Sequence, residues 1–234
     1  MRDDDAPAEQ GLPVFLAGGD DLAVRLRELA FGVLLQDAEP VEVERLASLS
    51  GMDGGVVREA LDALALAGKV DRDESGRVLG SAGLTISSGA HDLTLAGHRY
   101  RTWCAFDAIG IAAALGWDAR IDTACGICGR MIRLEMTSGF APAGAAARLW
   151  LSGGGRDMRA DFCTPTVLLC SEEHARAWAN RHGQHGQTLE LEPAAAVGAR
   201  TWRSAADVAH ALRHEPAQQP ATWFEGKDTE GKRR

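Results

Sequence analysis

The first residues whose types and spacing could do chemistry together are Cys104 and Asp107, at the start of a predicted helix. With Thr102 as the helix cap, Cys104 falls in the first turn, where backbone N–H groups and the helix dipole lower the pKa of a thiol. Asp107 lies three residues further on, so the two side chains share one face of the helix. A thiolate is a natural ligand for a soft metal, and a neighbouring carboxylate can accept the thiol proton and later return it. Taken alone, this segment nevertheless favours an inert buried cysteine beside a solvated aspartate.

Cys163 is a second candidate, because it stands just before a compact apolar run at 166–169 that predicts a buried strand. A cysteine at the entrance of a strand can face a pocket. Cysteine is also among the residue types most often buried, so Cys163 alone favours a structural role, and Cys170 at the far end of the strand does so more strongly. These two cysteines are seven residues apart with the strand between them, which suits shared tetrahedral coordination poorly.

Cys125 and Cys128 form a Cys-x-x-Cys-Gly turn between two predicted strands. This is the spacing of half a zinc knuckle. No second close pair of cysteine and histidine is apparent further along the chain, and His182 and His185 fit ordinary positions at the end of a helix. The pattern therefore favours structural packing of Cys125 and Cys128 over a metal site.

Three predicted helices and a hairpin precede these residues. Apolar residues at helical spacing predict helices at 22–33, 43–49 and 57–64. A turn at Ser75-Gly76 predicts a hairpin at 69–79. This is the element order of a winged helix-turn-helix. Between residues 53 and 77, however, six acidic side chains outnumber four basic ones, whereas a recognition helix and wing should be basic. We therefore predict a winged-helix-like structural module rather than a DNA reader.

From residue 83 the pattern changes to short strands interrupted by helices, which predicts an α+β fold. The larger part should hold a mixed or antiparallel sheet with flanking helices. The predicted helices lie at 104–115, 171–182 and 204–214, the last one capped by Ser204. We expect four parts: a flexible N-terminal arm at 1–20, the winged-helix-like domain at 21–82, the larger domain at 83–214 and a polar tail at 215–234.

The chain has 234 residues, 45% of them hydrophobic, and a formal net charge of −8. The acidic balance argues against nucleic acid or an anionic membrane as the main partner. No stretch is long and apolar enough to span a bilayer, and the acidic N-terminus does not resemble a signal peptide, so we expect a cytoplasmic protein. In that compartment its five cysteines are reduced, which favours a chemical role over disulfides.

Two motifs, considered together, resemble those of the organomercurial (alkylmercury) lyases. In that family a Trp-Cys-x-x-Asp helix start supplies one catalytic cysteine and the catalytic aspartate, here Trp103, Cys104 and Asp107. A later Phe-Cys before a buried strand supplies the second cysteine, here Cys163. The resemblance runs from about residue 22 to about residue 214. The flanking positions are also similar, at Leu84-Thr85, Tyr100 and Ala177-Trp178-Ala179.

The resemblance implies that the domain at 83–214 is a catalytic domain that cleaves a carbon–mercury bond. Cys104, Cys163 and Asp107 would be the catalytic residues and would also hold the Hg²⁺ product. Two thiolates would polarise the bond of an organomercury substrate, and Asp107 would protonate the carbon. The family needs no organic cofactor but does need excess thiol for turnover, and solution thiols or a mercuric reductase would accept the Hg²⁺. Its N-terminal module is winged-helix-like and does not read DNA.

Two positions depart from the family pattern. Thr164 stands where some members have a second cysteine, which is not part of the catalytic set. Cys125 matches a family cysteine that is structural, whereas Cys128 is additional. Cys125 and Cys128 are therefore possible structural thiols or thiols that transfer mercury.

Two other classes of function stay open from the residues alone. One is a metal-responsive winged-helix transcriptional regulator whose cysteines sense a thiophilic metal, which a basic surface would support. The other is a zinc-stabilised structural protein that uses Cys125 and Cys128, which metal in protein purified without added metal would support.

Overall fold

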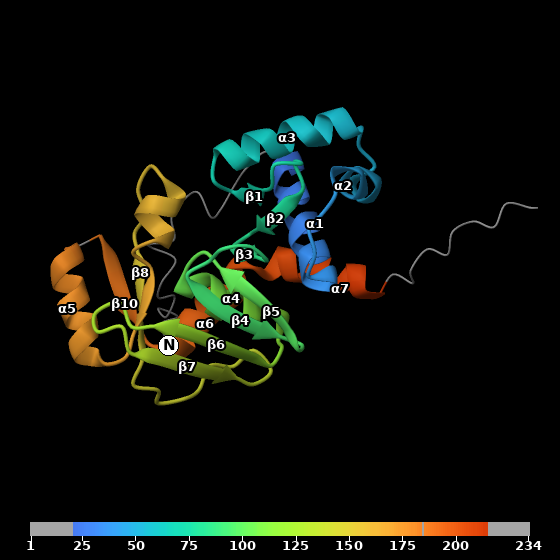
Figure 1. Ribbon diagram of the computed structural model, residues 1–234. Coiled ribbons are helices and arrows are strands. Elements are labelled where there is room, and N and C mark those ends of the chain that lie inside the picture. Colours follow the sequence, from blue (N-terminus) through green and yellow to red (C-terminus); the bar gives the residue numbers. More distant parts are fainter. Residues whose placement is uncertain (1–20, 184, 215–234) are drawn as a thin grey trace, which may run out of the picture.

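The computed structural model describes residues 21–183 and 185–214 (Figure 1). The predicted arm at 1–20 and the predicted tail at 215–234 lie outside these residues. The described chain opens with three helices and a hairpin in the predicted order: α1 (Asp21–Asp37), α2 (Val43–Ser50), α3 (Gly54–Leu66), β1 (Val70–Arg72) and β2 (Val78–Ser81). Asp53 caps α3, because its carboxylate accepts a hydrogen bond from the Gly55 N–H at 2.8 Å.

A seven-stranded antiparallel sheet runs through the molecule in the order β1-β2-β3-β5-β4-β6-β7. Its further strands are β3 (Leu84–Thr85), β4 (His91–Leu95), β5 (His98–Thr102), β6 (Ala119–Ala124) and β7 (Met131–Met136). Every second residue of β4, β6 and β7 is buried, so one face of the sheet carries the apolar side chains. Because β2 pairs with β3, the N-terminal hairpin belongs to the same sheet as the rest.

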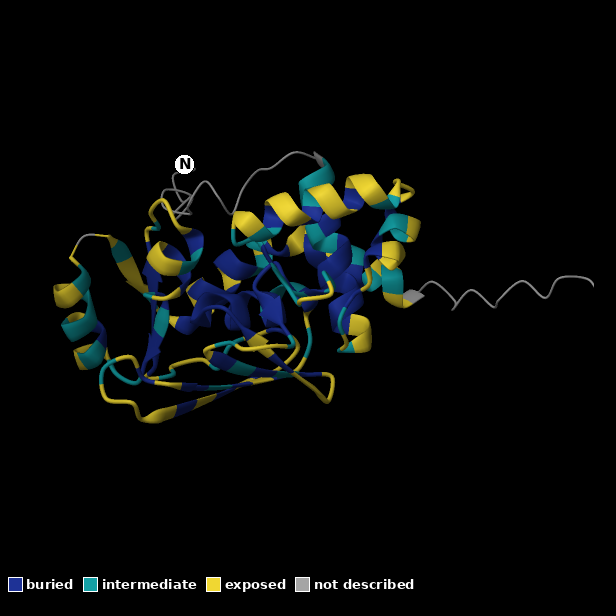
Figure 2. Cartoon of the chain, turned by 45° about the horizontal axis from the view of Figure 1, so that its top comes forward, coloured by how far each residue is buried: buried dark blue, intermediate teal, exposed yellow. Residues whose placement is uncertain are grey.

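Helix α4 (Ala105–Leu115) lies in the core and packs against strands β4, β5 and β6 and against α6 (Leu191–Thr201). The two helices touch at a pair of glycines, since a Cβ on Gly198 would lie only 2.3 Å from the Gly110 Cα. Helix α7 (Arg203–His214) packs along α1. Figure 2 shows the buried residues gathered between these layers, with exposed residues on the outer faces of α3 and α5.

A smaller antiparallel sheet stands beside the large one, with strand order β10-β8-β9. Its strands are β8 (Arg148–Ser152), β9 (Val167–Leu169) and β10 (Gly186–Leu189), and α5 (Glu172–His182) packs on all three. A single π-helical turn, η1 (Met158–Cys163), joins β8 to β9. This smaller unit therefore carries the Cys163 segment.

The fold is α+β with antiparallel sheets, as predicted, but several elements differ. No element was predicted at residues 191–201, where the structure has α6. Pro193 and Gly198 weaken the helical pattern of this segment, and packing against α4 compensates for their low helix propensity. The prediction that Ser204 caps the last helix was wrong, since α7 begins at Arg203 and the Ser204 hydroxyl bonds to the Glu28 carboxylate instead. Strands β8 and β10 were also missed. The winged-helix nature of residues 21–82 and the boundary at 82/83 stay predictions.

Across the described residues, the structure holds no helix with the length and apolar character needed to cross a bilayer.

Candidate active site

Cys104 is held at the N-terminus of α4. Its sulfur accepts a hydrogen bond from the Asp107 N–H at 3.4 Å, and the Asp107 Oδ2 accepts one from the Cys104 N–H at 2.8 Å. This reciprocal pair is a capping box in which Cys104 is the cap. The prediction that Thr102 caps the helix was wrong, because Thr102 is still paired in β5 and its hydroxyl donates to the Cys104 carbonyl at 2.9 Å.

Cys163 is the last residue of the π-helical turn η1, a rare conformation that is frequent at functional sites. Asp157 caps this turn, since its carboxylate accepts a hydrogen bond from the Arg159 N–H at 2.8 Å. Just beyond the turn, the Thr166 carbonyl accepts a hydrogen bond from the N–H of Ala105 at 3.2 Å. The segment of Cys163 is thereby tied to the first residue of α4.

The three predicted catalytic groups meet in space. The sulfurs of Cys104 and Cys163 and a carboxylate oxygen of Asp107 all lie within 4.8 Å of one another. All three residues are buried, with exposed fractions of 0%, 5% and 4%. A soft metal held by both sulfurs would therefore lie beside a carboxylate in a dry environment. The catalytic roles themselves stay a prediction.

Burial dominates the electrostatics of this group. It raises the pKa of the Asp107 carboxyl to about 6, although hydrogen bonds from Cys104 and the positive charge of Arg159 oppose the rise. Burial also raises the pKa of the Cys104 thiol well above its ordinary value, and Cys163 and Asp107 raise it further. The prediction that the helix N-terminus lowers this pKa was wrong, because desolvation outweighs the single N–H bond. At neutral pH the pair is thus a protonated thiol beside a carboxylate.

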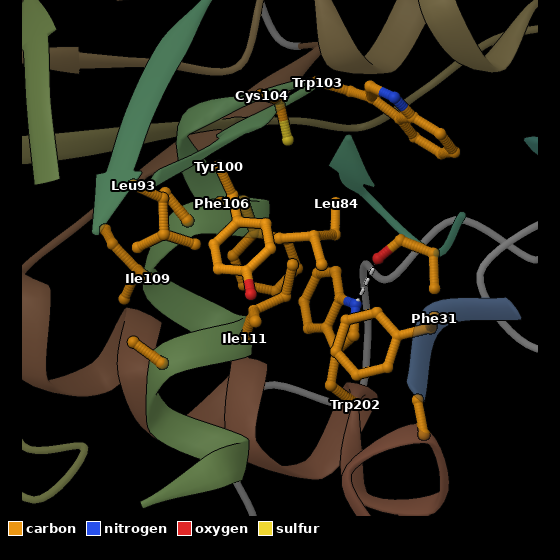
Figure 3. Close-up of a cluster of buried hydrophobic side chains, with 14 of the residues drawn as sticks. Phe31, Leu84, Leu93, Tyr100, Trp103, Cys104, Phe106, Ile109, Ile111 and Trp202 are labelled. Atoms are coloured by element: carbon orange, nitrogen blue, oxygen red, sulfur yellow. Dashed lines mark hydrogen bonds between the residues drawn. The ribbon is translucent and has the colours of Figure 1, made fainter. Parts of the chain in front are cut away.

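A cavity of about 210 Å³ opens beside these groups. Asp107 and Cys163 line it, whereas the fully buried Cys104 lies behind them. Figure 3 shows Cys104 at the start of α4, next to a layer of aromatic rings that includes Phe106 and Trp202. The rest of the wall is mostly apolar, with two charged residues from α1, and includes Ala82, Trp103, Met158, Phe162, Trp202, Arg27 and Glu28.

Gly83 leaves room for the Asp107 carboxyl group because it has no side chain. Its φ of 92° lies in the left-handed region, and a Cβ there would lie 2.6 Å from the Asp107 Cγ. A larger residue would therefore displace the carboxyl group.

Asp71 of the N-terminal hairpin contacts both segments that carry the predicted catalytic residues. Its carboxylate accepts hydrogen bonds from the Trp103 indole N–H at 2.7 Å and from the Arg159 guanidinium at 2.8 Å. The guanidinium carbon also lies 3.2 Å from the centroid of the Trp103 ring. Trp103 precedes Cys104, and Arg159 belongs to the turn that ends at Cys163. This role of Asp71 was not predicted, because Asp71 is one of several acidic residues in a predicted hairpin.

A second sulfur cluster lies outside this site, formed by Cys125, Cys128, Cys170 and His174. The statement that no second Cys/His pair follows the Cys-x-x-Cys turn was therefore wrong. Cys170 and His174 are four residues apart, a spacing that one turn of helix brings together, and this signal was present in the sequence. His182 is not part of the cluster and stacks on the Trp178 ring.

The thiols of this cluster differ in acidity. Burial alone would raise the pKa of Cys125, but hydrogen bonds from the backbone N–H groups of Cys128, Cys170 and Ile127 and from His174 lower it to about 6. Burial and the neighbouring thiols Cys125 and Cys128 raise the pKa of Cys170 to about 11. Of these two thiols, Cys125 is therefore the more acidic.

Known proteins are similar to this chain in sequence and in fold. Residues 84–203 match the family model for MerB, alkylmercury lyase. The alkylmercury lyase of Pseudomonas putida is 32% identical over 161 residues, which cover 67% of this chain and 71% of the relative. That of Bacillus cereus is 28% identical over 185 residues, with 77% and 82% covered. The fold is similar to the crystal structure of the mercury-bound form of MerB2, with a TM-score of 0.71 at 20% identity, covering 82% of this chain and 95% of that one.

The matched residues span about half of the chain and contain Cys104, Asp107 and Cys163. The family resemblance predicted from the two motifs is thus confirmed: this chain belongs to the alkylmercury lyases, a family of enzymes.

Proposed function

We propose that this chain is an organomercurial lyase that converts an organomercury compound into a hydrocarbon and Hg²⁺ by protonolysis. One observation carries the proposal: two thiols and a carboxyl group lie within 4.8 Å of one another at a buried cavity. Membership of the alkylmercury lyase family supports the same class of reaction.

Substrate capture begins at Cys163. Its side chain lines the cavity, while Cys104 lies behind the wall and is fully buried. The Cys163 sulfur bonds to the mercury of R–Hg–X, and its proton leaves with the displaced ligand X. The apolar walls suit the organic group R, because they bury it away from water.

Cys104 then binds as the second sulfur and gives its proton to Asp107. The carboxyl group is suited to this task because its pKa of about 6 leaves it ionised at neutral pH but close to the pH at which it must later donate. Two thiolates on mercury raise its electron density and weaken the mercury–carbon bond.

Asp107 finally donates the proton to the carbon, and the mercury–carbon bond breaks. Of the two thiol protons, one has left with X and the other leaves on the hydrocarbon R–H, so the step balances. Hg²⁺ stays on the sulfurs of Cys104 and Cys163, with the Asp107 carboxylate beside it. Excess solution thiol or a mercuric reductase removes it, and no organic cofactor takes part.

The N-terminal module, in this proposal, is a winged-helix-like support and not a DNA reader. Asp71 directs its carboxylate toward Trp103 and Arg159, which belong to the two catalytic segments. The module thus helps to hold Cys104 and Cys163 at one place.

The test is hydrocarbon release from phenylmercury in the presence of excess thiol, with benzene measured by gas chromatography. We expect benzene in proportion to enzyme and time. Asp92→Asn is the matched control, because Asp92 lies in a partly exposed ion pair with Arg101 and should not affect release. Benzene no faster than in enzyme-free solution would refute the proposal.

A further inference from the structure

The second sulfur cluster has no part in the proposed reaction. Cys125 and Cys128 come from the turn between β6 and β7, Cys170 follows β9, and His174 lies in the first turn of α5. Two chain segments that are far apart in sequence, 125–128 and 170–174, therefore meet here. Their three sulfurs and one imidazole nitrogen all lie within 4.8 Å of one another.

Three distances among these four atoms are close to those of a tetrahedral metal site. Zinc binds sulfur at about 2.3 Å and nitrogen at about 2.0–2.1 Å, so the edges of such a tetrahedron are about 3.8 Å between sulfurs and about 3.6 Å between sulfur and nitrogen. The Cys128 and Cys170 sulfurs are 3.8 Å apart. The His174 Nδ1 lies 3.4 Å from the Cys125 sulfur and 3.2 Å from the Cys170 sulfur.

We propose that Cys125, Cys128, Cys170 and His174 bind one structural zinc ion. Three cysteines and one histidine are a common ligand set of structural zinc sites, which are filled by four protein ligands and leave no open position. The Cys170 N–H already donates to the Cys125 sulfur at 3.5 Å, a backbone contact of the kind that supports a thiolate ligand. Cys128 is exposed, so a metal ion has a path from solvent.

The zinc ion would join the two sheets of the molecule. The β6–β7 turn belongs to the seven-stranded sheet, and Cys170 follows β9 of the smaller sheet. These parts already touch, because the Gly126 N–H donates to the Leu168 carbonyl at 3.1 Å. A cross-link here would fix β9, whose other end leads back to Cys163. The zinc site would therefore hold in place the smaller unit, which carries the proposed catalytic residue Cys163.

This proposal does not depend on the lyase reaction, and metal content tests it directly. Protein produced with zinc in the medium and purified without chelator should retain about one zinc per chain. Cobalt exchanged into the site should show the sulfur-to-cobalt charge-transfer absorption and the strong d–d bands of tetrahedral coordination. Removal of the zinc by a chelator should lower Tm by about 5–10 °C, the range for loss of a tightly bound ligand in a chain of this size.

Variants identify the ligands. Cys128→Ser and His174→Ala should each lose the zinc and the cobalt spectrum. His174→Cys should keep both, because it converts the site to four cysteines, and this variant separates a lost ligand from a lost fold. The matched control His98→Ala changes an exposed histidine on β5 and should keep the zinc. Cys163→Ser should also keep it, since Cys163 belongs to the other cluster.

Three results would overturn the proposal. Wild-type protein with five free thiols and no stoichiometric zinc would show that the cluster is an unmetallated packing of thiols. A disulfide between Cys128 and Cys170 in place of the metal would assign their proximity to redox chemistry. Zinc that is lost in Cys163→Ser but kept in Cys128→Ser and His174→Ala would place the metal in the active site.

Discussion

The part of the chain that the structure describes holds two cysteine clusters that differ in burial, in the number of thiols and in the group beside them. The cluster of Cys104, Cys163 and Asp107 is buried, lies at a cavity and has a carboxyl group as its third member. The cluster of Cys125, Cys128, Cys170 and His174 is only partly buried, with one exposed cysteine and an imidazole. We propose that the first cluster binds mercury and supplies a proton, whereas the second surrounds a structural metal ion.

In this account, two features determine whether a pair of thiols acts on a substrate or holds a structural metal ion. They are the number of protein ligands and the chemistry of the group beside the thiols. Two sulfurs leave positions open on a bound mercury atom, and a carboxyl group with a pKa of about 6 can move a proton beside it. Four ligands fill a tetrahedron and leave nothing for a substrate. Both clusters share one strand, because β9 runs between Cys163 and Cys170, so a metal at the second cluster would steady the first.

The largest effect should follow from loss of a catalytic thiol. Cys163→Ser and Cys104→Ser should each reduce turnover by about 10³-fold or more, the scale for removal of a catalytic nucleophile, because a hydroxyl is a poor ligand for mercury. The rate of hydrocarbon release, measured with zinc content and Tm, checks this. Near-normal turnover in either variant would remove that cysteine from the catalytic set.

Asp107→Asn should come next. An amide cannot carry a proton, so hydrocarbon release should fall by about 10²–10⁴-fold while mercury still binds to the protein. In the wild type, formation of the second sulfur–mercury bond needs the ionised carboxylate. Its rate should therefore rise as the pH rises through about 6 and fall below that pH. Single-turnover release and bound mercury across pH test both parts, and unchanged release would assign the acid to another group.

Asp71→Asn tests whether the N-terminal hairpin positions both catalytic segments. Loss of the charge should loosen Trp103 and Arg159 and lower kcat by about 10- to 100-fold, as expected when reacting groups are misplaced by a fraction of an ångström to an ångström. Asp62→Asn is the matched control, because Asp62 is an exposed carboxylate that pairs with Arg72 and contacts neither Trp103 nor Arg159. Equal kcat in both variants would leave Asp71 a purely structural role.

The smallest effect on chemistry should come from the second cluster. Cys128→Ser should lower Tm, because the cross-link that holds β9 is lost, but should keep the rate of the first turnover within about twofold, because Cys128 is not one of the groups that bind the substrate or move the proton. Comparison of burst and steady-state rates checks this. A loss that appears only after the first turnover would instead give Cys128 a role in passing Hg²⁺ to solution thiols.

Local features of the sequence predicted much of this protein. The three N-terminal helices have strong apolar periodicity, and the two catalytic motifs are short and continuous, so both were visible without a fold. The α6 helix was not predicted, because Gly198 disfavours a helix locally and its close packing against Gly110 on α4 is visible only in the fold.

Features that depend on tertiary contacts were not predicted. The raised pKa of Cys104 reflects burial that the sequence does not display, and Asp71 acts only because the hairpin lies against both catalytic segments. The Cys170–His174 pair was visible by spacing. Its meeting with Cys125 and Cys128 depends on the β6–β7 turn reaching β9.

The most direct test of the central claim is a single turnover of phenylmercury in D₂O, with enzyme in excess and both benzene and bound mercury measured by mass spectrometry. The account predicts benzene with one deuterium, because the proton on carbon comes from an exchangeable thiol by way of Asp107. It also predicts that one Hg²⁺ stays on the protein and shields Cys104 and Cys163 from alkylation. Mercury bound with no benzene released, or the same release from Cys104→Ser and Cys163→Ser, would contradict it.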